Sequence, residues 1–179
     1  MKKTFYPVIR KILKKRNVEN LLDIGCGTGE LLQQIREDNQ SIILYGTDIS
    51  SKMVKLAKSK NINSAQIIEG DAEKLPYEKK QFDVVLCVSG INYYEQPEKV
   101  FAEAYRVLKK GGIFIVCDRY EKAFVRVIFN RIIFPFFSKN GEIKIYGERW
   151  IRIFFAANRF RKVHWRQMHG NRFVAYGIK

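Results

Sequence analysis

A glycine-rich turn between an apolar strand and a helix dominates the first third of this chain. Residues 21–32 read LLDIGCGTGELL. Gly25, Gly27 and Gly29 let the backbone approach a ligand that a Cβ would hold away, and the helix that follows directs free N–H groups into the same space. The turn therefore predicts a binding site for a small polar ligand.

The spacing of these glycines and the acid before them narrow the choice of ligand. The glycines form G-x-G-x-G rather than the G-x-G-x-x-G of dinucleotide-binding turns. Asp23 lies just before the turn, where its carboxylate would face the diphosphate of NAD. A carboxylate at this point suits a ligand that carries positive charge, so an NAD-dependent enzyme is disfavoured.

Short apolar runs alternate with segments of helical spacing, as in α/β proteins with a mostly parallel sheet. Strands are predicted over 20–24, 42–47, 65–69, 82–88 and 113–117, and helices over 5–16, 30–38, 98–109 and from the N-cap Ser50 through Ala57. Gly111-Gly112 are expected to end the helix at 98–109 as its C-cap. Beyond residue 119 the pattern predicts helices over 121–137 and 147–157, a break at 140–141, and strands over 160–168 and 173–178 joined by a hairpin turn at 169–171.

The length of 179 residues fits a single domain with a sizeable core. No run of the sequence approaches the roughly 20 apolar residues that span a bilayer, and the basic N-terminus lacks the apolar segment of a secretory signal. Cys26, Cys87 and Cys117 have no metal-ligand spacing and are interpreted as buried small residues in a reducing compartment. We therefore expect a cytoplasmic protein.

The net charge of +15 is unevenly distributed along the chain. Residues 120–179 hold 13 Lys and Arg against 3 Asp and Glu, and residues 2–16 hold seven basic residues and no acid. Such a field favours anionic partners: nucleic acid, an anionic membrane surface, or a phosphorylated or carboxylated metabolite. The alternative is a lysine-rich surface that only keeps the protein in solution.

Four motifs, taken in order, resemble the class I S-adenosylmethionine (SAM) methyltransferases, and among them the small-molecule group that includes the ubiquinone and menaquinone methyltransferases. They are LLDIGCGTGELL at 21–32, YGTDISSKMVKLAK at 45–58, IIEGDAEKLPYEKKQFDVVLCV at 67–88 and VFAEAYRVLKKGGIFIV at 100–116. The resemblance implies an α/β, Rossmann-like fold with a seven-stranded, mostly parallel sheet whose last strand is antiparallel. Residues 1–179 would form one domain, with a helix at 1–18 as a lid and a substrate-covering insertion at 119–146.

The resemblance also implies which residues hold SAM, a sulfonium cation with an amino-acid tail, a ribose and an adenine. The glycine-rich turn would lie against the methionine and ribose portion, while Asp23 would orient the turn and hold the ammonium group. Asp48 would accept hydrogen bonds from the ribose hydroxyls, and Asp71 from the adenine amine. The implied cofactor residues are Asp23, Gly25, Cys26, Gly27, Gly29, Asp48, Ile49, Met53, Asp71, Ala72, Val88 and Ser89.

Several of these residues have structural alternatives. Asp48 can cap the helix that follows it, and Asp71 can shape a Gly-Asp turn. Met53 suits the core as well as it suits the adenine. Cys26 and Cys87 are interpreted as packing residues rather than nucleophiles.

Methyl transfer from SAM, which yields S-adenosylhomocysteine, is an in-line displacement that needs a positioned acceptor and exclusion of water, but no metal. A base is required only where the acceptor loses a proton, and the candidates for a catalytic residue are Tyr6, Tyr93 and Tyr94. Quinone-type members of the family often carry a His shortly after the fourth strand, where residues 89–94 of this chain read SGINYY. That departure argues against a quinone or phenol acceptor.

The region 119–146 mixes aromatic residues with arginines. These side chains could close over a small anionic or amphiphilic acceptor, stack on bases, lie on a membrane surface, or simply pack on the sheet. The substrate-binding candidates are Arg119, Tyr120, Arg126 and Tyr146.

The sequence therefore predicts a SAM-dependent methyltransferase with a small acceptor. One alternative is an RNA or nucleotide-linked methyltransferase that uses the basic C-terminal region, although the tetrapeptide of exocyclic-amine enzymes is absent after the fourth strand. Another is a non-catalytic binding module that retains the SAM fold, since fold alone does not define function.

Overall fold

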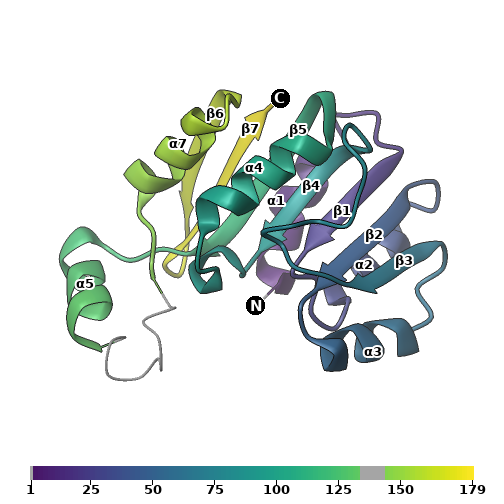
Figure 1. Cartoon of the computed structure of the whole chain (residues 1–179), viewed down its shortest axis with the longest axis horizontal. Helices are drawn as coiled ribbons and strands as arrows, with labels where there is room; N and C mark the ends of the chain where they lie inside the picture. The colour runs from purple at the N-terminus through teal and green to yellow at the C-terminus, as the bar shows by residue number, and fades with distance from the viewer. Residues whose placement is uncertain (1, 134–143) are drawn as a thin grey trace.

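The structure, a computed structural model, describes residues 2–133 and 144–179, and a seven-stranded sheet forms its centre (Figure 1). The strand order is β3-β2-β1-β4-β5-β7-β6. β7 is antiparallel to both β5 and β6, whereas the pairs among β1 to β5 are parallel, which confirms the predicted sheet. The strands are β1 Asn20–Ile24, β2 Ile43–Asp48, β3 Ala65–Glu69, β4 Phe82–Val88, β5 Leu108–Arg119, β6 Arg161–Met168 and β7 Arg172–Ile178.

Helices cover both faces of the sheet. The core on one face takes buried side chains from α1, α2 and α3, and the core on the other takes them from α4 and α7. The helices are α1 Lys2–Leu13, α2 Glu30–Asp38, α3 Ser51–Ser59, α4 Pro97–Val107, α5 Ala123–Ile128 and α7 Glu148–Ala157, with a 3-10 turn η1 at Ile91–Tyr93 and a π-helical turn η2 at Phe129–Ile133.

The continuous apolar run of β4 follows from its central position. Val84, Leu86 and Val88 pack into the core beneath α1 to α3, while Val85 and Cys87 pack into the core beneath α4 and α7. A strand that is buried on both faces needs apolar residues at every position rather than at alternate ones. Every residue from Val84 to Val88 is fully buried.

The expected glycine C-cap of the helix before β5 is wrong. α4 ends at Val107, and Leu108 already pairs with Phe82 in the sheet. The last carbonyls of α4 are instead bound by Lys179, whose Nζ donates to the carbonyl oxygens of Tyr105 at 2.6 Å and Leu108 at 2.8 Å. Lys179 lies at the far end of the sequence, so no local pattern could indicate this cap.

The two glycines of that segment serve the strand. The pairing between β4 and β5 shifts register after Phe82, and residues 109–112 take up the irregularity. A Cβ on Gly112 would lie 2.9 Å from the carbonyl oxygen of Lys109 and 3.1 Å from that of Asp83. Only glycine fits where backbone approaches backbone this closely.

Other predicted boundaries differ in smaller ways. α1 spans residues 2–13 rather than 5–16, and its Phe5, Ile9 and Leu13 are buried against the neighbouring layer. The segment predicted as a helix over 121–137 forms α5 and η2 up to residue 133. Its last residues and the predicted break at 140–141 lie outside the described residues.

The hairpin that ends the chain is confirmed. Gly170 and Asn171, between β6 and β7, have φ values of +72° and +52°, the left-handed conformation that such turns require. Among the described residues, no helix has the length and apolar character needed to cross a bilayer.

Candidate active site

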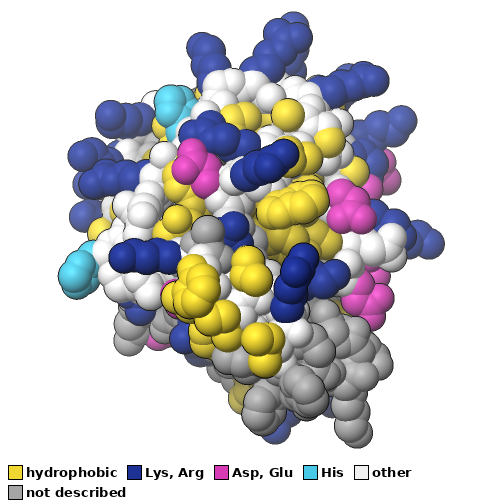
Figure 2. Space-filling view, turned by 90° about the vertical axis from the view of Figure 1, so that its left-hand side faces the viewer, with side chains coloured by type: hydrophobic (Ala, Val, Ile, Leu, Met, Phe, Trp, Pro, Cys, Tyr) yellow, Lys and Arg dark blue, Asp and Glu magenta, His cyan; other side chains and the backbone are white. Residues whose placement is uncertain are grey.

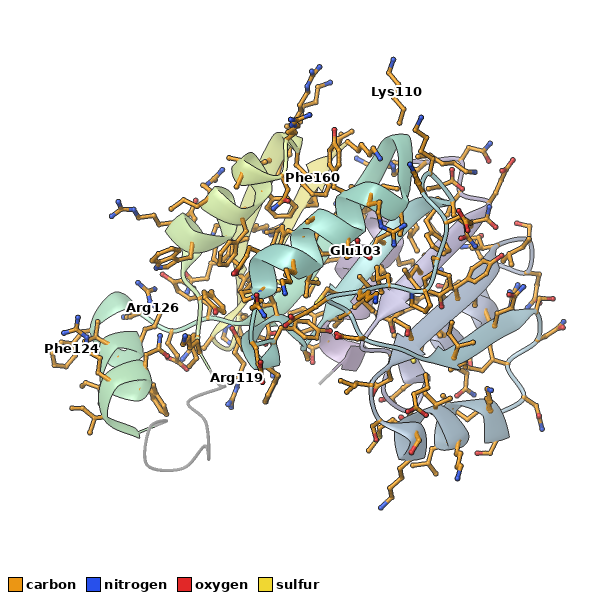
Figure 3. All side chains as sticks on the ribbon, in the orientation of Figure 1. Glu103, Lys110, Arg119, Phe124, Arg126 and Phe160 are labelled. Atoms are coloured by element: carbon orange, nitrogen blue, oxygen red, sulfur yellow. The ribbon has the colours of Figure 1, made fainter. Side chains whose placement is uncertain are left out.

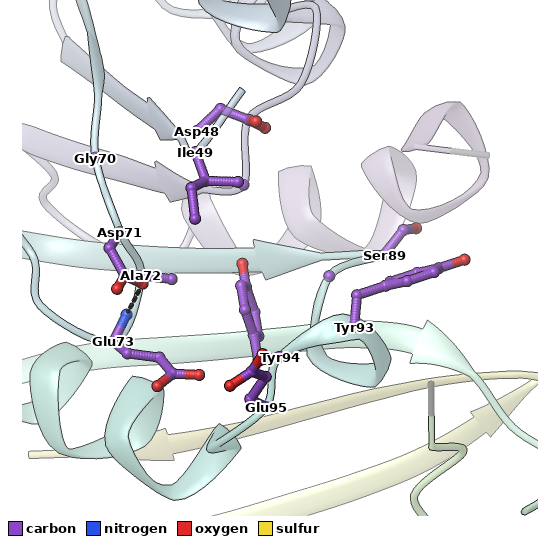
Figure 4. Close-up of a pocket in the computed structure, with 12 residues that line it drawn as sticks. Asp48, Ile49, Gly70, Asp71, Ala72, Glu73, Ser89, Tyr93, Tyr94 and Glu95 are labelled. Atoms are coloured by element: carbon purple, nitrogen blue, oxygen red, sulfur yellow. Dashed lines mark hydrogen bonds between the residues drawn. The ribbon is translucent and has the colours of Figure 1, made fainter. Parts of the chain in front are cut away.

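A cavity of about 470 Å³ opens where β1, β2 and β4 end. β1 lies between β2 and β4 in the sheet, and the chain crosses to opposite sides of β1 to form them. In α/β sheets such a reversal leaves a crevice outside the carboxyl ends of the strands, where ligands bind. Twelve residues line the cavity (Figure 4): Gly25, Asp48, Ile49, Gly70, Asp71, Ala72, Glu73, Ser89, Gly90, Tyr93, Tyr94 and Glu95.

The glycine-rich turn has a backbone that requires glycine at three positions. Gly25, Gly27 and Gly29 have φ values of +65°, +59° and +73°, which L side chains adopt only with strain. The amide of Cys26 donates to the carbonyl of Thr47 at 3.0 Å. This bond ties the turn to the end of β2 and fixes one wall of the cavity.

Asp48 links the glycine-rich turn to α3. Its Oδ2 accepts from the amide of Gly27 at 2.8 Å, and its Oδ1 accepts from the amide of Ser50 at 3.0 Å. Ser50 in turn caps α3, because its hydroxyl accepts from the amide of Met53. The alternative role of Asp48 as the cap of this helix is therefore wrong, because Ser50 is the N-cap; Asp48 holds Ser50 and the turn together and also lines the cavity.

Asp71 combines a turn with a place in the cavity wall. Its Oδ1 accepts from the amide of Glu73 at 2.8 Å, drawn as a dashed line in Figure 4. The carboxylate lines the cavity beside Ala72, which is buried. The Gly-Asp turn is thus real and presents a carboxylate to the cavity.

The remaining predicted cofactor residues divide into two groups. Ile49 lines the cavity and leaves 73% of its surface exposed, so an apolar side chain is available at the mouth. Asp23, Cys26 and Val88 are fully buried and do not line the cavity. Met53 is half-buried on α3 and is also absent from the lining.

Ser89 has an unusual backbone and an unsatisfied side chain. Its φ is +59°, uncommon for a residue other than glycine, and its amide donates to the carbonyl of Cys117 at 2.7 Å. Its hydroxyl is buried and finds no hydrogen-bond partner among the described residues. Strained backbone and unpaired polar atoms cluster at functional sites.

Tyr94 projects into the cavity over the glycine-rich turn, and Figure 4 shows its ring between Ala72 and Tyr93. Its hydroxyl lies 2.9 Å from the position of a Cβ added to Gly25 and 3.0 Å from that of a Cβ added to Gly90. Burial, then Cys87 and the carboxylates of Asp23 and Asp48, raise the pKa of Tyr94 well above its usual value. The phenol keeps its proton, so Tyr94 is suited to donate a hydrogen bond rather than to act as a base.

The other two tyrosine candidates occupy different environments. Tyr93 lines the cavity with 53% of its surface exposed. Tyr6 does not line it: its hydroxyl donates to the carbonyl of Gln34 at 2.9 Å and to the carboxylate of Asp38. Burial and Asp38 raise the pKa of Tyr6. Tyr6 thus projects from α1 onto the second half of α2, away from the cavity lining, which argues against a catalytic role.

The cavity is acidic although the protein is strongly basic. Asp48, Asp71, Glu73 and Glu95 are among its lining residues, and within the described part of the chain no Lys or Arg lines it. The net charge of the whole chain is +15. A ligand with positive charge and several hydrogen-bond donors fits this lining.

The four substrate-binding candidates are not brought together. Arg119 lies beside the hairpin of β6 and β7, with Gly170 and Arg172. Tyr120 packs edge-on against Trp165 at 5.8 Å. None of the four lines the cavity.

The other two candidates lie near the start of α7. Tyr146 packs edge-on against Phe154 at 5.4 Å. Arg126 comes from α5 (Figure 3), and its guanidinium lies so close to Gly147 that a Cβ there would clash with it. The expectation that the candidates surround one acceptor is therefore not met by the described residues.

Sequence reasoning missed a buried acid beside the site. Asp118 is 1% exposed near the end of β5, and burial raises its pKa to about 6 despite hydrogen bonds from the amides of Arg119 at 2.7 Å and Asn92 at 3.4 Å. Asn92, also buried, accepts from the amide of Tyr146 through its Oδ1 at 3.3 Å. The sequence does carry a signal for this residue, since Asp118 directly follows the apolar run 113–117 of β5.

Comparisons with known proteins agree with the fold and the glycine-rich turn. The methyltransferase domain family matches residues 22–116, which is more than half of the chain. A demethylmenaquinone methyltransferase of Thermotoga maritima is 29% identical over 108 residues, 60% of this chain and 47% of that protein. The chloroplastic 2-methyl-6-phytyl-1,4-hydroquinone methyltransferase 1 of Oryza sativa subsp. japonica is 34% identical over 149 residues, 74% of this chain and 44% of that protein.

A solved structure extends the similarity of fold to nearly the whole chain. The crystal structure of a SAM-dependent methyltransferase from Thermotoga maritima has a TM-score of 0.79 and 20% identity, and the match covers 99% of this chain and 89% of that one. The chain belongs to the methyltransferase domain family, with the Rossmann-like class I fold, and SAM is the cofactor of this class. The chain spans about half the length of the curated relatives it matches.

Proposed function

We propose that this protein transfers a methyl group from SAM to a small-molecule acceptor. The observation that carries the proposal is the acidic cavity at the end of the sheet, lined by Gly25 of the glycine-rich turn and by four carboxylates. The carboxylates beside this turn match a ligand that combines a cation, an amine and hydroxyl groups.

The residues that line the cavity offer groups that match the separate parts of SAM. A Cβ on Gly25 would lie 2.9 Å from the hydroxyl of Tyr94, so glycine at this position lets that phenol lie against the turn. Asp48 and Asp71 present carboxylates that can accept from hydroxyl and amine groups of the cofactor, and Ile49 offers an apolar surface for a flat ring. The buried hydroxyl of Ser89 at the end of β4 can bind a polar group close to the reacting centre.

SAM supplies an activated methyl group when it is bound. The contribution of the protein is then to hold the acceptor in line with that methyl group and to exclude water. Tyr93 and Tyr94, after β4, lie on the side of the cavity where an acceptor can enter. The protonated phenol of Tyr94 can orient an acceptor oxygen or nitrogen by a hydrogen bond.

An amphiphilic acceptor is favoured over an anionic one. The four carboxylates of the lining would repel an anion, whereas Ile49 and Tyr93 expose apolar surface at the mouth. Two relatives are named for demethylmenaquinone and for a phytyl hydroquinone. The absence of a His in the stretch 89–94 distinguishes this chain from the quinone-type pattern, so the acceptor need not be a quinone.

An RNA methyltransferase is the second candidate, favoured only by the basic C-terminal region. It is weaker because the acidic lining would repel a phosphate backbone at the mouth. We also propose a cytoplasmic location, supported by three buried cysteines that have no metal-ligand spacing in the sequence.

Formation of S-adenosylhomocysteine tests the proposal. The protein is incubated with SAM and with separate pools of amphiphilic metabolites, acidic metabolites and RNA. We expect product only with the amphiphilic pool, and less product for Tyr93→Ala than for Glu37→Gln, a control that removes an exposed carboxylate outside the cavity. Binding of SAM without product from any pool would support a non-catalytic binding module instead.

A further inference from the structure

Exposed apolar side chains gather on α5, η2 and α7, at the end of the molecule opposite α3 (Figures 1 and 2). They are Phe124, Val127 and Ile132 at 78%, 49% and 57% exposure, and Trp150 and Ile153 at 52% and 42%. Figure 3 shows Phe124 projecting outward at this edge. We call these five residues and the basic residues among them the α5–α7 surface.

Two contacts join the segment formed by α5 and η2 to the segment that leads into α7. The side-chain amide of Asn130 in η2 donates to the carbonyl of Ile145 at 3.1 Å, and its oxygen accepts from the amide of Ile145 at 3.0 Å. The guanidinium of Arg126 lies against Gly147, the residue before α7. The two helical segments are therefore held together and present neighbouring exposed side chains.

The charge of this surface is almost entirely positive. Residues 122–131 and 144–153 carry six basic residues and one acid, Glu148, which pairs with Arg152 at 2.8 Å. Figure 2 shows Lys and Arg side chains around and between the hydrophobic groups on this side of the molecule. The basic residues are Lys122, Arg126, Arg131, Lys144, Arg149 and Arg152.

We propose that the α5–α7 surface docks on an anionic lipid bilayer. Large apolar side chains beside a basic fringe match the interface of such a bilayer, where the apolar groups enter the boundary between headgroups and acyl chains and the cations meet lipid phosphates. Trp and Phe occur on the apolar faces of helices that lie in this interface, and long Arg side chains place their charge at the headgroups while their apolar stems lie along the apolar surface. The charge complementarity selects an anionic bilayer over a neutral one.

RNA fits the surface less well. Three of the five exposed apolar residues are aliphatic, namely Val127, Ile132 and Ile153, and these cannot stack on bases as aromatic rings do. The same residues add favourable apolar area when they enter a lipid interface.

The docked surface would lie next to the acceptor side of the cavity. The carbonyl of Asn92 in η1 accepts from the amide of Lys144 at 3.0 Å, and Tyr93 of the same turn lines the cavity. An amphiphilic acceptor could then pass between bilayer and cavity. This link rests on the proposed function, whereas docking itself does not.

Flotation with vesicles tests docking without reference to methyl transfer. The full chain is mixed with vesicles of phosphatidylcholine and phosphatidylglycerol, or of phosphatidylcholine alone. We expect flotation only with the anionic vesicles and release at high salt. Phe124→Ser with Trp150→Ser should abolish it, and each of Arg131→Gln and Arg149→Gln should weaken binding about fivefold. The matched control, Leu56→Ser with Lys55→Gln on exposed positions of α3, should float as the wild type does.

Tryptophan fluorescence gives a second readout that does not depend on a damaging substitution. The chain has two tryptophans, and Trp165 stacks on Phe173 at 4.1 Å. In a Trp165→Phe variant, the emission of Trp150 should shift to the blue and resist iodide quenching when anionic vesicles are added. Three results would overturn the proposal: no flotation of the folded wild type, binding to a single-stranded RNA but not to vesicles, or a shielded Trp150 in a lipid-free dimer.

Discussion

The hydroxyl oxygen of Tyr94 lies 2.9 Å from the position that a Cβ on Gly25 would occupy. Gly25 is therefore constrained twice, by this contact and by its φ of +65°. Tyr94, which follows η1, and Gly25, in the turn after β1, together determine how much room a ligand has at this end of the sheet. The contact joins two residues that are 69 positions apart in the sequence. The requirement for glycine at position 25 therefore has two causes, the contact with Tyr94 and the positive φ, and each can be measured separately.

The first prediction concerns Gly25→Ala. The left-handed backbone should cost roughly 1–2 kcal/mol of unfolding free energy, and the contact with Tyr94 should add to that cost and weaken SAM binding. Gly111→Ala is the matched control, because Gly111 has a φ of +80° but nothing within 4 Å of an added Cβ. Urea denaturation of both variants measures the difference.

Tyr94→Phe completes the test by removing the oxygen. In the Gly25→Ala background it should restore part of the lost stability, and in the Gly111→Ala background it should restore none. Equal losses for the two alanine variants, with no rescue by Tyr94→Phe, would refute the close contact.

The second prediction concerns Asp118 and the pH dependence of stability. Its folded pKa of about 6 lies above the unfolded value of about 3.9, so the folded state binds the proton more tightly. Stability from this residue is present below about pH 4 and is lost as pH rises through 6. Asp118→Asn should therefore flatten the decline between pH 4 and 6 and should stabilise the protein at pH 7 by about 1–3 kcal/mol.

Asp83 supplies a comparison with the opposite sign. Burial opposes its ionisation, but amide donors from Asn20 and Glu19 and the ammonium of Lys109 lower its pKa overall. Asp83→Asn should cost about 1–3 kcal/mol at pH 7, and the difference from wild type should shrink as pH falls below 4. An Asp118→Asn variant that behaves like Asp83→Asn would contradict the environment assigned to Asp118.

The strands and the glycine-rich turn could be predicted because their signals are local. β1, β3, β4 and α2 have the predicted boundaries. In β1 and β4, burial on both faces imposes continuous apolar runs, and in α2 the inward residues recur at helical spacing. The glycine-rich turn could be recognised because glycine is the residue that adopts positive φ without strain, and all three glycines of the turn have positive φ. Local chemistry also placed Ser50 correctly as the N-cap of α3.

What the sequence could not indicate depends on distant contacts. The end of α4 is decided by Lys179 and by the shifted pairing with β4. Tyr6 was a candidate because it lies in the N-terminal helix that was expected to act as a lid, yet its hydroxyl binds Asp38 of α2. Tyr120 and Tyr146 pack against Trp165 and Phe154, partners that composition could not identify.

The third prediction concerns the attachment of α5 and η2. Asn130→Ala removes both hydrogen bonds to Ile145, so this segment should open locally while the sheet remains folded. The free energy of local opening should fall by about 1–2 kcal/mol, which corresponds to roughly fivefold to thirtyfold faster cleavage by trypsin after Arg126 and Arg131. Limited proteolysis followed by mass spectrometry measures the rates.

Asn158→Ala is the control for that experiment. It removes a comparable bond from a side-chain amide to the carbonyl of Phe154 at 2.9 Å, at the other end of α7. Cleavage at Arg126 and Arg131 should be unchanged in this variant. Equal acceleration in both variants would show that α7 as a whole, rather than Asn130, holds the segment.

The most direct test of the central claim is calorimetric titration of SAM and S-adenosylhomocysteine into the wild type, Asp48→Ala, Asp71→Asn and the control Glu37→Gln. Removing a carboxylate that accepts charge-assisted hydrogen bonds should weaken binding to Asp48→Ala by roughly 30-fold to 1000-fold. Asp71→Asn, which leaves the glycine-rich turn intact, should also weaken binding, and Glu37→Gln should not. Absence of binding to a wild-type protein that circular dichroism shows to be folded would contradict the account.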